Sequence, residues 1–246
     1  MPERCLFYYI TDRTAFAADE STRRRRLLEK IAEAAHAGVD YIQLREKDLT
    51  THELGSLARA AIAIVREAAK PTTGHWPRTT ALLINSRTDV ALAVGADGVH
   101  LRSDDVSPRE VSAIWKEAHV RTAAIGCPAQ SAAVVVPAAE PAERTPLIGV
   151  SCHSPEEVSQ AKADGATFAV LAPIFEKKSL PTAHPAGLAN LREACQADIP
   201  VLALGGVTIK NAQSCLEAGA AGITAIRLFQ ENDIADVVQS LRRLDG

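Results

Sequence analysis

The chain has 246 residues, of which 47% are hydrophobic and 23% are charged, and its formal net charge is −3. This composition is typical of a folded globular protein and excludes a largely disordered chain. The small net charge gives no general affinity for nucleic acid or for anionic membranes, so we expect neither as a partner.

Cysteine usage and the absence of apolar targeting segments indicate the compartment. The five cysteines are odd in number and form no Cys-x-x-Cys pair: Cys5, Cys127, Cys152, Cys195 and Cys215. A zinc site or a disulfide framework is therefore not expected. No signal-peptide core and no window of about 18 continuous apolar residues is present. We expect a reduced, cytoplasmic protein.

Short apolar runs alternate with amphipathic stretches along the whole chain. Strands are expected at Leu6–Ile10, Val39–Leu44, Ala81–Asn85, Gly98–Leu101, Leu147–Ser151, Phe168–Pro173, Val201–Gly206 and Gly222–Arg227. Helices are expected near 22–37, 51–69, 88–95, 107–118, 154–164, 187–197, 208–218 and 233–243. Apolar strands separated by helices indicate a parallel sheet covered by helices. Eight such units in 246 residues predict a single α/β domain, a (β/α)8 TIM barrel.

Junctions between the predicted elements support the barrel. Glycine recurs where a helix ends and the next strand begins, as at Gly38, Gly95, Gly165 and Gly219, where it suits a left-handed helix cap. A dinucleotide-binding sheet would need Gly-x-Gly-x-x-Gly after the first strand, and Thr11-Asp12-Arg13 stands there instead. Two loop insertions, near 70–80 and 121–146, precede strands and are expected at the face away from the chemistry.

Polar and cationic residues gather where the predicted strands end, which is the active face of a (β/α)8 barrel. Although the chain is acidic as a whole, these ends carry an excess of positive charge: Thr11-Asp12, Gln43-Leu44-Arg45-Glu46-Lys47, Asn85-Ser86-Arg87, His100 to Asp105, Ser151-Cys152-His153, the loop 174–187, Gly205-Gly206 and Ile226-Arg227. This contrast predicts a small phosphorylated substrate.

Gln43, Arg45 and Lys47 alternate along the end of the second predicted strand, so their side chains share one face. Pointing into the barrel mouth, they offer an amide, a planar guanidinium and a point charge, which suits a heteroaromatic ring carrying phosphates. The alternative is a solvated strand end. Inward charges without a ligand would be unfavourable, and this favours the binding interpretation.

The segment Gly205-Gly206-Val207-Thr208 follows the seventh predicted strand and precedes a predicted helix. Bare backbone amides and a helix N-terminus bind anions, and the phosphate site of these barrels usually lies after strands seven and eight. Arg227 is expected to end the eighth strand beside it and to add a guanidinium. The alternative is a tight turn that requires glycine.

Two further strand ends carry candidate chemistry. Asp105 is a candidate ligand for Mg²⁺, which often takes one or two carboxylates plus substrate phosphates; Asp104 or Asp105 equally suits the start of the next helix. His153 suits general acid/base catalysis near neutral pH, with Ser151 on the same face as an expected substrate contact. A structural histidine is equally compatible with this position.

These residues, in this order, resemble the thiamine phosphate synthase family and its TenI-type relatives over nearly the whole chain. Any one stretch alone would be a weak signal, but together they are specific. The resemblance is carried by Tyr9-Ile10-Thr11-Asp12, Gln43-Leu44-Arg45-Glu46-Lys47, Ala96-Asp97-Gly98-Val99-His100-Leu101, Gly149-Val150-Ser151-Cys152-His153-Ser154, Pro173-Ile174-Phe175 and Leu204-Gly205-Gly206-Val207.

The resemblance implies a transferase of thiamine biosynthesis. The synthase joins hydroxymethylpyrimidine pyrophosphate to thiazole phosphate and releases pyrophosphate. By resemblance, Gln43, Arg45 and Lys47 grip the pyrimidine pyrophosphate, and Asn85 contacts the pyrimidine side. Asp105 is implied as a ligand of Mg²⁺, the expected cofactor. Cations and magnesium would neutralise the leaving pyrophosphate as a carbocation-like centre develops on the pyrimidine.

The resemblance also implies a second anion site. Gly206 and the backbone at Ile226 and Arg227 would hold the thiazole phosphate. The expected partners are therefore two small phosphorylated heteroaromatic molecules, and the sequence leaves a homo-oligomer open.

This chain departs from the synthase pattern at several positions. Ser86 stands where the pattern has a second magnesium-binding aspartate, and Leu180 stands where it has a lysine. The pattern's glycine after the fourth strand is Arg102, and its serine near the eighth is Arg227. Lys177-Lys178 or Arg102 are candidates to replace the lysine, and no residue replaces the carboxylate.

The TenI-type relatives provide an alternative function. They aromatise a thiazole tautomer without pyrophosphate or magnesium, and the histidine that they use matches His153. Ser86 and Leu180 favour this isomerase, whereas the joint presence of the pyrophosphate-binding residues and Asp105 favours the synthase, which we expect. A third alternative is a non-catalytic binding or regulatory protein of the thiamine pathway.

Overall fold

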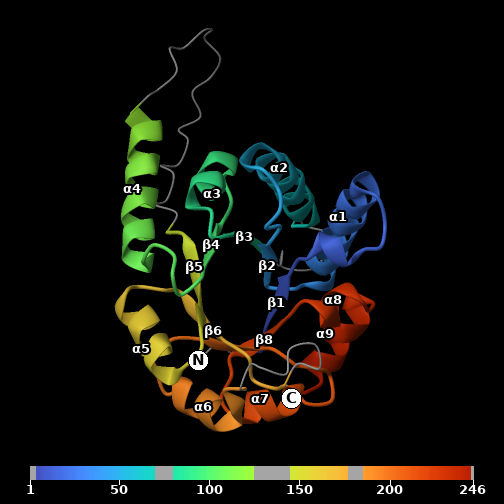
Figure 1. Cartoon of the computed structure of the whole chain (residues 1–246), viewed down its shortest axis with the longest axis vertical. Coiled ribbons are helices and arrows are strands. Elements are labelled where there is room, and N and C mark those ends of the chain that lie inside the picture. Colours follow the sequence, from blue (N-terminus) through green and yellow to red (C-terminus); the bar gives the residue numbers. More distant parts are fainter. Residues whose placement is uncertain (1–3, 70–79, 125–144, 177–184, 245–246) are drawn as a thin grey trace, which may run out of the picture.

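Eight parallel strands close into a barrel, and helices surround it (Figure 1). The computed structural model describes residues 4–69, 80–124, 145–176 and 185–244. Strand order follows chain order from β1 to β8, and β8 pairs with β1 in parallel to complete the ring. This topology confirms the predicted (β/α)8 barrel.

Each strand is short and apolar, and the helices lie between successive strands in the chain. The strands are β1 (Leu6–Ile10), β2 (Tyr41–Leu44), β3 (Ala81–Asn85), β4 (Gly98–Leu101), β5 (Leu147–Cys152), β6 (Phe168–Leu171), β7 (Val201–Leu204) and β8 (Gly222–Ala225). The helices are η1 (Arg13–Ala15), α1 (Glu20–Ala37), α2 (Thr51–Ala68), α3 (Thr88–Val94), α4 (Pro108–Ala124), α5 (Pro155–Ala163), α6 (Gly187–Ala194), α7 (Ala212–Glu217), α8 (Arg227–Gln230) and α9 (Ile234–Arg242). Among the described residues, no helix combines the length and apolarity needed to span a membrane.

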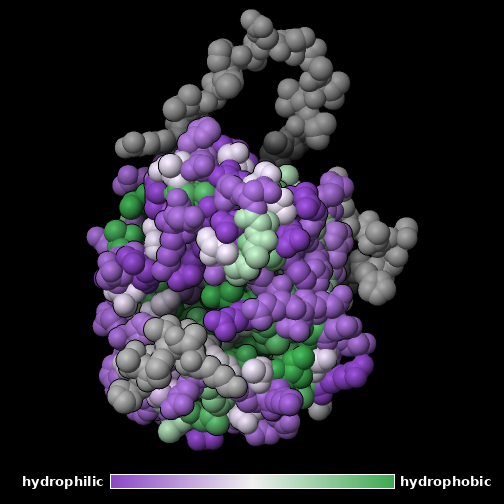
Figure 2. Space-filling model, turned by 45° about the vertical axis from the view of Figure 1, so that its right-hand side comes forward, coloured by the Kyte–Doolittle hydropathy of each residue, from purple (hydrophilic) through white to green (hydrophobic). Residues whose placement is uncertain are grey.

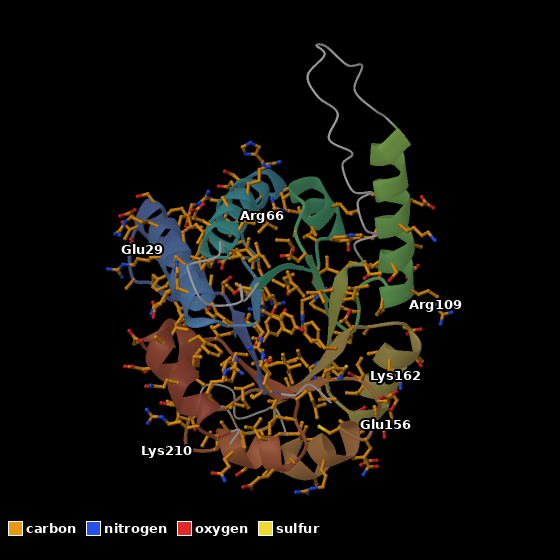
Figure 3. All side chains as sticks on the ribbon, turned by 180° about the vertical axis from the view of Figure 1, so that it is seen from behind. Glu29, Arg66, Arg109, Glu156, Lys162 and Lys210 are labelled. Atoms are coloured by element: carbon orange, nitrogen blue, oxygen red, sulfur yellow. The ribbon has the colours of Figure 1, made fainter. Side chains whose placement is uncertain are left out.

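Side chains fill the inside of the barrel, as the view from behind shows (Figure 3). Strand residues alternate between the inside and the outside, and one buried cluster faces inward: Tyr8, Leu83, Phe168, Val170 and Leu202. Tyr41 and Phe168 stack with ring centroids 5.0 Å apart and planes at 4°. Because this interior is a packed core, a ligand can enter only at the mouth of the barrel.

A larger core lies between the strands and the surrounding helices. The opposite strand faces contribute residues such as Phe7, Ile42 and Ile84, all 0% exposed. Charged side chains extend away from this layer, as seen for Glu29, Arg66, Arg109, Glu156, Lys162 and Lys210 (Figure 3). The face shown in Figure 2 is accordingly mostly hydrophilic.

Inward glycines make room for the aromatic rings. A Cβ at Gly149 on β5 would lie 2.5 Å from Phe168 Cζ and 2.8 Å from His100 Nδ1, closer than real Cβ contacts allow. The absence of a side chain at this position therefore lets an aromatic ring and a histidine pack across the barrel from neighbouring strands.

Several boundaries differ from the prediction. The seventh strand ends at Leu204 rather than Gly206, because Gly205 and Gly206 have φ of 97° and 68°, outside the β region. The predicted eighth strand, to Arg227, ends at Ala225, and Arg227 begins α8 instead. The fourth helix continues to Ala124 through an alanine-rich stretch that favours helix, into the predicted insertion. Most of that insertion and of the predicted 70–80 loop lies outside the described residues.

The glycine packing predicts the effect of one added methyl group. Gly149→Ala should lower the free energy of unfolding by about 1–3 kcal/mol, because overpacking displaces buried rings. Gly55→Ala in α2 is the control: its Cβ would meet only Arg59 Nη1, at 3.7 Å, so helix propensity should raise stability by about 0.5–1 kcal/mol. Chemical denaturation measures both changes. Unchanged stability in Gly149→Ala would contradict the packing described.

Candidate functional site

The ends of β2 and β3 hold a connected row of polar side chains. Gln43 is 1% exposed, and its Nε2 donates to Asn85 Oδ1 at 2.8 Å. Asn85 Nδ2 then donates to Ser86 Oγ at 3.1 Å. Gln43 and Asn85 are thus brought together, at the end of the barrel where the sequence predicted a substrate contact.

One acceptor in this row lacks a donor. Gln43 Oε1 is buried and accepts no hydrogen bond from the described residues. Leaving a buried acceptor unsatisfied is unfavourable by about 1–3 kcal/mol, and a ligand N–H that reached this atom would remove the penalty. The arrangement therefore fits a ring that carries an amine or amide.

Ser86 has an unusual backbone conformation. Its φ is 57°, and no other non-glycine residue in the described part of the chain has a positive φ. Asn and Asp adopt this left-handed conformation more readily than most residues. The turn therefore suits the aspartate that the synthase pattern has here, and the serine removes a carboxylate from a backbone that would accept one.

A second polar row runs up the barrel interior to β5. His100 on β4 is 2% exposed, and its Nδ1 lies 3.1 Å from the Tyr8 hydroxyl. Its Nε2 lies 2.9 Å from Ser151 Oγ. Burial and the positive charge of Arg45, opposed in part by Asp105, lower the pKa of His100 to about 3. A neutral His100 therefore orients the Ser151 hydroxyl.

Three cations lie near one another at the mouth. Arg45 is half-buried, whereas Lys47 and Arg102 are exposed. The charge of Arg45, partial burial and the charge of Arg102 lower the pKa of Lys47. Arg45 and Arg102 are thus close enough to Lys47 for their charges to act on it, although β2 ends at Leu44 and Lys47 lies in the turn that follows. Such a concentration of like charge favours an anionic ligand.

Asp105, the predicted magnesium ligand, is engaged by Arg102. Its Oδ2 accepts the Arg102 backbone N–H at 2.8 Å, and its Oδ1 lies 3.5 Å from the guanidinium, which also contacts Asp104 at 3.1 Å. Neither Asp104 nor Asp105 caps the helix that follows, which was the alternative role. Ser107 caps α4 instead, with its hydroxyl accepting from Glu110 N at 3.3 Å.

The donor set does not fit a magnesium ion held by the protein. Among the described residues, no group of three or more histidine, cysteine, aspartate and glutamate side chains is arranged to hold a metal. Magnesium needs oxygen ligands in near-octahedral geometry, and the one predicted carboxylate faces a guanidinium. Ser86 Oγ, in the position of the second carboxylate, already accepts from Asn85.

The loop after β7 keeps its backbone bare. A Cβ at Gly206 would lie 2.7 Å from Phe175 Cβ, so this position accepts no side chain. The helix predicted near 208–218 begins later than expected, at Ala212, so its N-terminus does not lie beside Gly206. Asn211 stabilises a turn instead: it accepts from Thr208 N at 2.7 Å and donates to Gly206 O at 3.0 Å.

The short helix α8 follows β8 at the same rim. Ile226 occupies its N-cap position without a side-chain cap, so the first-turn N–H groups are not capped by that residue. Buried Gln230 ties α8 to the loop after β1, because it accepts from Asp12 N at 3.1 Å and donates to Asp12 O at 2.6 Å. The predicted phosphate-binding residues thus follow the paired strands β7 and β8: Gly206 lies in the loop after β7, and Ile226 and Arg227 begin α8.

His153 lies beyond the end of β5 and is exposed. Its Nδ1 lies 2.7 Å from the Ala172 carbonyl, and because a carbonyl can only accept, Nδ1 carries a proton. Glu157 fixes the backbone by accepting from His153 N at 2.8 Å. In the neutral form, Nε2 would therefore be the basic atom of the ring.

Sequence reasoning missed the supporting residues of the site. Tyr8 and His100 lie inside predicted strands, and Gln230 lies in a helix that was not predicted. The signal for His100 was its alternation with Arg102 along one strand, but a histidine in an apolar strand equally suits a packed core.

A closed barrel whose strand ends carry grouped cations, a buried amide and a bare glycine loop belongs to the class of (β/α)8 enzymes that act on phosphorylated small molecules. The sequence model of the family described as thiamine monophosphate synthase matches residues 7–143 and 129–229. The chain therefore belongs to this family, as the resemblance predicted.

Individual relatives agree over most of their length. The chain is 35% identical over 225 residues to the putative thiamine-phosphate synthase 2 of Aquifex aeolicus, covering 91% of this chain and 97% of that protein. It is 33% identical to the thiamine-phosphate synthase of Roseiflexus castenholzii, covering 91% and 80%. Its fold matches the thiamine phosphate pyrophosphorylase of Pyrococcus furiosus with a TM-score of 0.69 and 26% identity, covering 97% and 94%.

The buried neutral histidine predicts a pH effect on stability. Between pH 6.5 and about 3, the unfolded chain binds a proton at His100 that the folded chain does not. The contribution of neutral His100 to the free energy of unfolding is therefore fully present above pH 6.5 and is lost as the pH falls below it. The slope from this residue is about 1.4 kcal/mol per pH unit. His100→Gln should flatten the dependence between pH 6.5 and about 5, above the range of most carboxylates. Denaturation curves measure this, with exposed His153→Gln as control; equal slopes in wild type and His100→Gln would contradict the burial.

Proposed function

We propose that this chain is a thiamine-phosphate synthase. It transfers the hydroxymethylpyrimidine group from its pyrophosphate ester to the ring nitrogen of thiazole phosphate, which forms thiamine phosphate and releases pyrophosphate. Family membership and the names of the reported relatives support this activity over the tautomerase and the binding-only alternative. The observation that carries it is the unpaired acceptor of buried Gln43 close to grouped cations.

The pyrimidine pyrophosphate binds at the ends of β2, β3 and β4. Gln43 Oε1 accepts from the ring amine, while Asn85, held by Gln43 Nε2, orients the same ring. Arg45 offers a planar fork to pyrophosphate oxygens and Lys47 offers a point charge, so the two cations make different contacts.

The thiazole phosphate binds at the loops after β7 and β8. The backbone at Gly206 and at Ile226 and Arg227, which follow the paired strands β7 and β8, supplies N–H groups to the phosphate. Ser151, oriented by His100, lies between the two halves at the end of β5 and contacts the reacting centre. His153 lies at the neighbouring rim, where its ring offers a hydrogen bond to the substrate.

Catalysis in this arrangement is electrostatic. As the bond between the pyrimidine methylene carbon and the pyrophosphate oxygen breaks, negative charge grows on the leaving group and positive charge grows on the pyrimidine. Cations that are already in place stabilise the leaving group without reorganising. The thiazole nitrogen then supplies the electron pair of the new bond.

Arg102 supplies positive charge where the family pattern has glycine. The magnesium ion expected from the resemblance would neutralise pyrophosphate, but Asp105 is paired with Arg102 and Ser86 brings no carboxylate. We therefore assign to Arg102, together with Arg45 and Lys47, the neutralisation of the leaving group by the protein itself. This guanidinium also remains a candidate substitute for the lysine that the pattern has at Leu180, which lies outside the described residues.

We also propose that the enzyme is a single domain and cytoplasmic. The ring of strands uses both ends of the described chain, since β1 pairs with β8. The described cysteines Cys152, Cys195 and Cys215 are free thiols, which supports a reducing compartment.

One assay tests the activity directly. The purified protein receives both synthase substrates in magnesium-containing buffer, and separately the thiazole tautomer. We expect thiamine phosphate and pyrophosphate to form in equal amounts. Arg45→Ala should lower kcat/KM by about 10²–10³-fold, and Arg109→Ala, which changes a 76% exposed side chain near Asp164, should leave it unchanged. Turnover of the tautomer without thiamine phosphate, or no turnover of either, would contradict the proposal.

The donor set predicts weak magnesium binding that two substitutions should strengthen. In Ser86→Asp/Arg102→Ala, the new carboxylate and the released Asp105 would provide two ligands, so Mg²⁺ affinity should rise by roughly tenfold or more. Calorimetric titration of Mg²⁺ into substrate-free protein measures this without an activity assay. Tight Mg²⁺ binding by the wild type would show that Asp105 is available after all.

A further inference from the structure

A buried cluster of polar residues lies behind the cationic strand end and has no part in the chemistry described above. Thr11 and Arg13 follow β1, and Glu46 follows β2; they are 0%, 3% and 5% exposed. Charged side chains are rarely buried to this extent unless they are paired. Such burial indicates that the cluster holds neighbouring segments of the chain in place.

Glu46 is the centre of the cluster. One carboxylate oxygen accepts from the Thr11 hydroxyl at 2.6 Å. The Arg13 backbone N–H reaches both oxygens, at 3.3 and 3.1 Å, and the Arg13 guanidinium reaches Oε2 at 3.1 Å. These contacts join the loop after β1 to the residue that lies between Arg45 and Lys47.

Further hydrogen bonds from Arg13 and to Thr11 hold the segment that follows β2. The Arg13 guanidinium binds both oxygens of Asp48, at 2.7 and 3.0 Å. Thr11 Oγ1 accepts from the backbone N–H of Arg45 at 3.0 Å. The backbone is thus held at residue 45 itself and through side chains on either side of Lys47.

The segment after β2 has to be held in place because the cations at the barrel mouth repel one another. Arg45 and Arg102 both contribute to lowering the pKa of Lys47, so their charges are close enough to interact. Without an anion, this repulsion favours conformations that separate the cations. The opposite charges of buried Glu46 and exposed Asp48 oppose that separation.

We propose that Thr11, Arg13 and Glu46 are positioning residues that hold Arg45 and Lys47 in place for the pyrophosphate group. They touch no substrate and act through the backbone of residues 45–48. The proposal rests on the proposed function for the identity of the anion, although the cluster itself is observed directly. Exposed Asp48 completes the cluster from the solvent side.

Threonine substitutions test the proposal. Thr11→Val removes both hydrogen bonds, and we expect kcat to fall and the KM for the pyrimidine pyrophosphate to rise, by about 10- to 100-fold in kcat/KM. The KM for thiazole phosphate should stay within about twofold, because that site lies on other loops. Thr11→Ser keeps the hydroxyl and should restore wild-type kinetics.

Thr80→Val is the matched control. Thr80 is also buried, at 6% exposed, and donates to the Val39 carbonyl at 2.7 Å, next to the starts of β2 and β3 at the opposite end of the barrel. It should lose comparable stability without a change in kinetics. Equal kinetic losses in Thr80→Val, or wild-type kinetics in Thr11→Val, would overturn the proposal.

A second pair covers the case in which Thr11→Val does not fold. Asp48→Asn changes a 58% exposed side chain and should raise the KM for the pyrimidine pyrophosphate by about threefold. Asp198→Asn, at 99% exposed and paired with Lys162, is its control and should change nothing. An unchanged KM in Asp48→Asn would count against the proposal.

Inorganic pyrophosphate separates the two proposals. If the wild type makes no thiamine phosphate, the proposed function fails, but titration calorimetry with pyrophosphate still reports on the positions of Arg45 and Lys47. Weaker pyrophosphate binding in Thr11→Val, rescued by Thr11→Ser, would support positioning. Equal binding in all three proteins would overturn it.

Discussion

Positive charges that repel one another have to be held together before an anion can use them. At this barrel mouth, the charge of Arg45, partial burial and the charge of Arg102 lower the pKa of Lys47. A lowered pKa is expected for a lysine close to other positive charges. The chain opposes the repulsion with acidic groups on the opposite side of the same strand end, where Arg13 binds Glu46 and Asp48. Glu46 is buried next to half-buried Arg45 in the chain, and Lys47 and Asp48 lie exposed in the turn that follows.

The barrel separates this polar rim from a dry interior. Aromatic rings and aliphatic side chains fill the inside below the mouth, and glycine at 149 allows them to meet. The polar groups that do enter, such as His100, are neutral and hydrogen-bonded on both ring nitrogens. Charge is therefore confined to the strand ends, where an anionic substrate can reach it and where Gln43 presents an unpaired acceptor.

The strands were predictable because they depend on short periodic patterns. The alternation predicted for Gln43, Arg45 and Lys47 does not continue that far, because β2 ends at Leu44 and Lys47 lies in a turn. A strand buried on both faces reads as an apolar run, and its polar end marks the rim. Three other features were not visible in such patterns. The start of α7, the beginning of α8 at Arg227 and the pairing of Asp105 with Arg102 depend on side-chain contacts that compete with the expected element or ligand.

The positioning cluster was invisible for a related reason. Thr11 and Glu46 are 35 positions apart in the chain, and only the parallel pairing of β1 with β2 brings the ends of these strands together. No spacing rule connects such residues, and Glu46 appears in the sequence only as an acidic residue between two bases. The family resemblance includes Thr11 and Glu46 in its motifs, but the contacts that explain their roles come from the structure.

The central claim is that the mouth holds crowded cations that await an anion, and titration of the Lys47 amine by NMR tests it most directly. With labelled lysine side chains and Lys47→Arg to assign the signal, the pKa of Lys47 in the free protein should lie below the ordinary 10.5. Adding inorganic pyrophosphate should raise it, because the anion neutralises the neighbouring charges. A pKa at the ordinary value that pyrophosphate leaves unchanged would contradict the account.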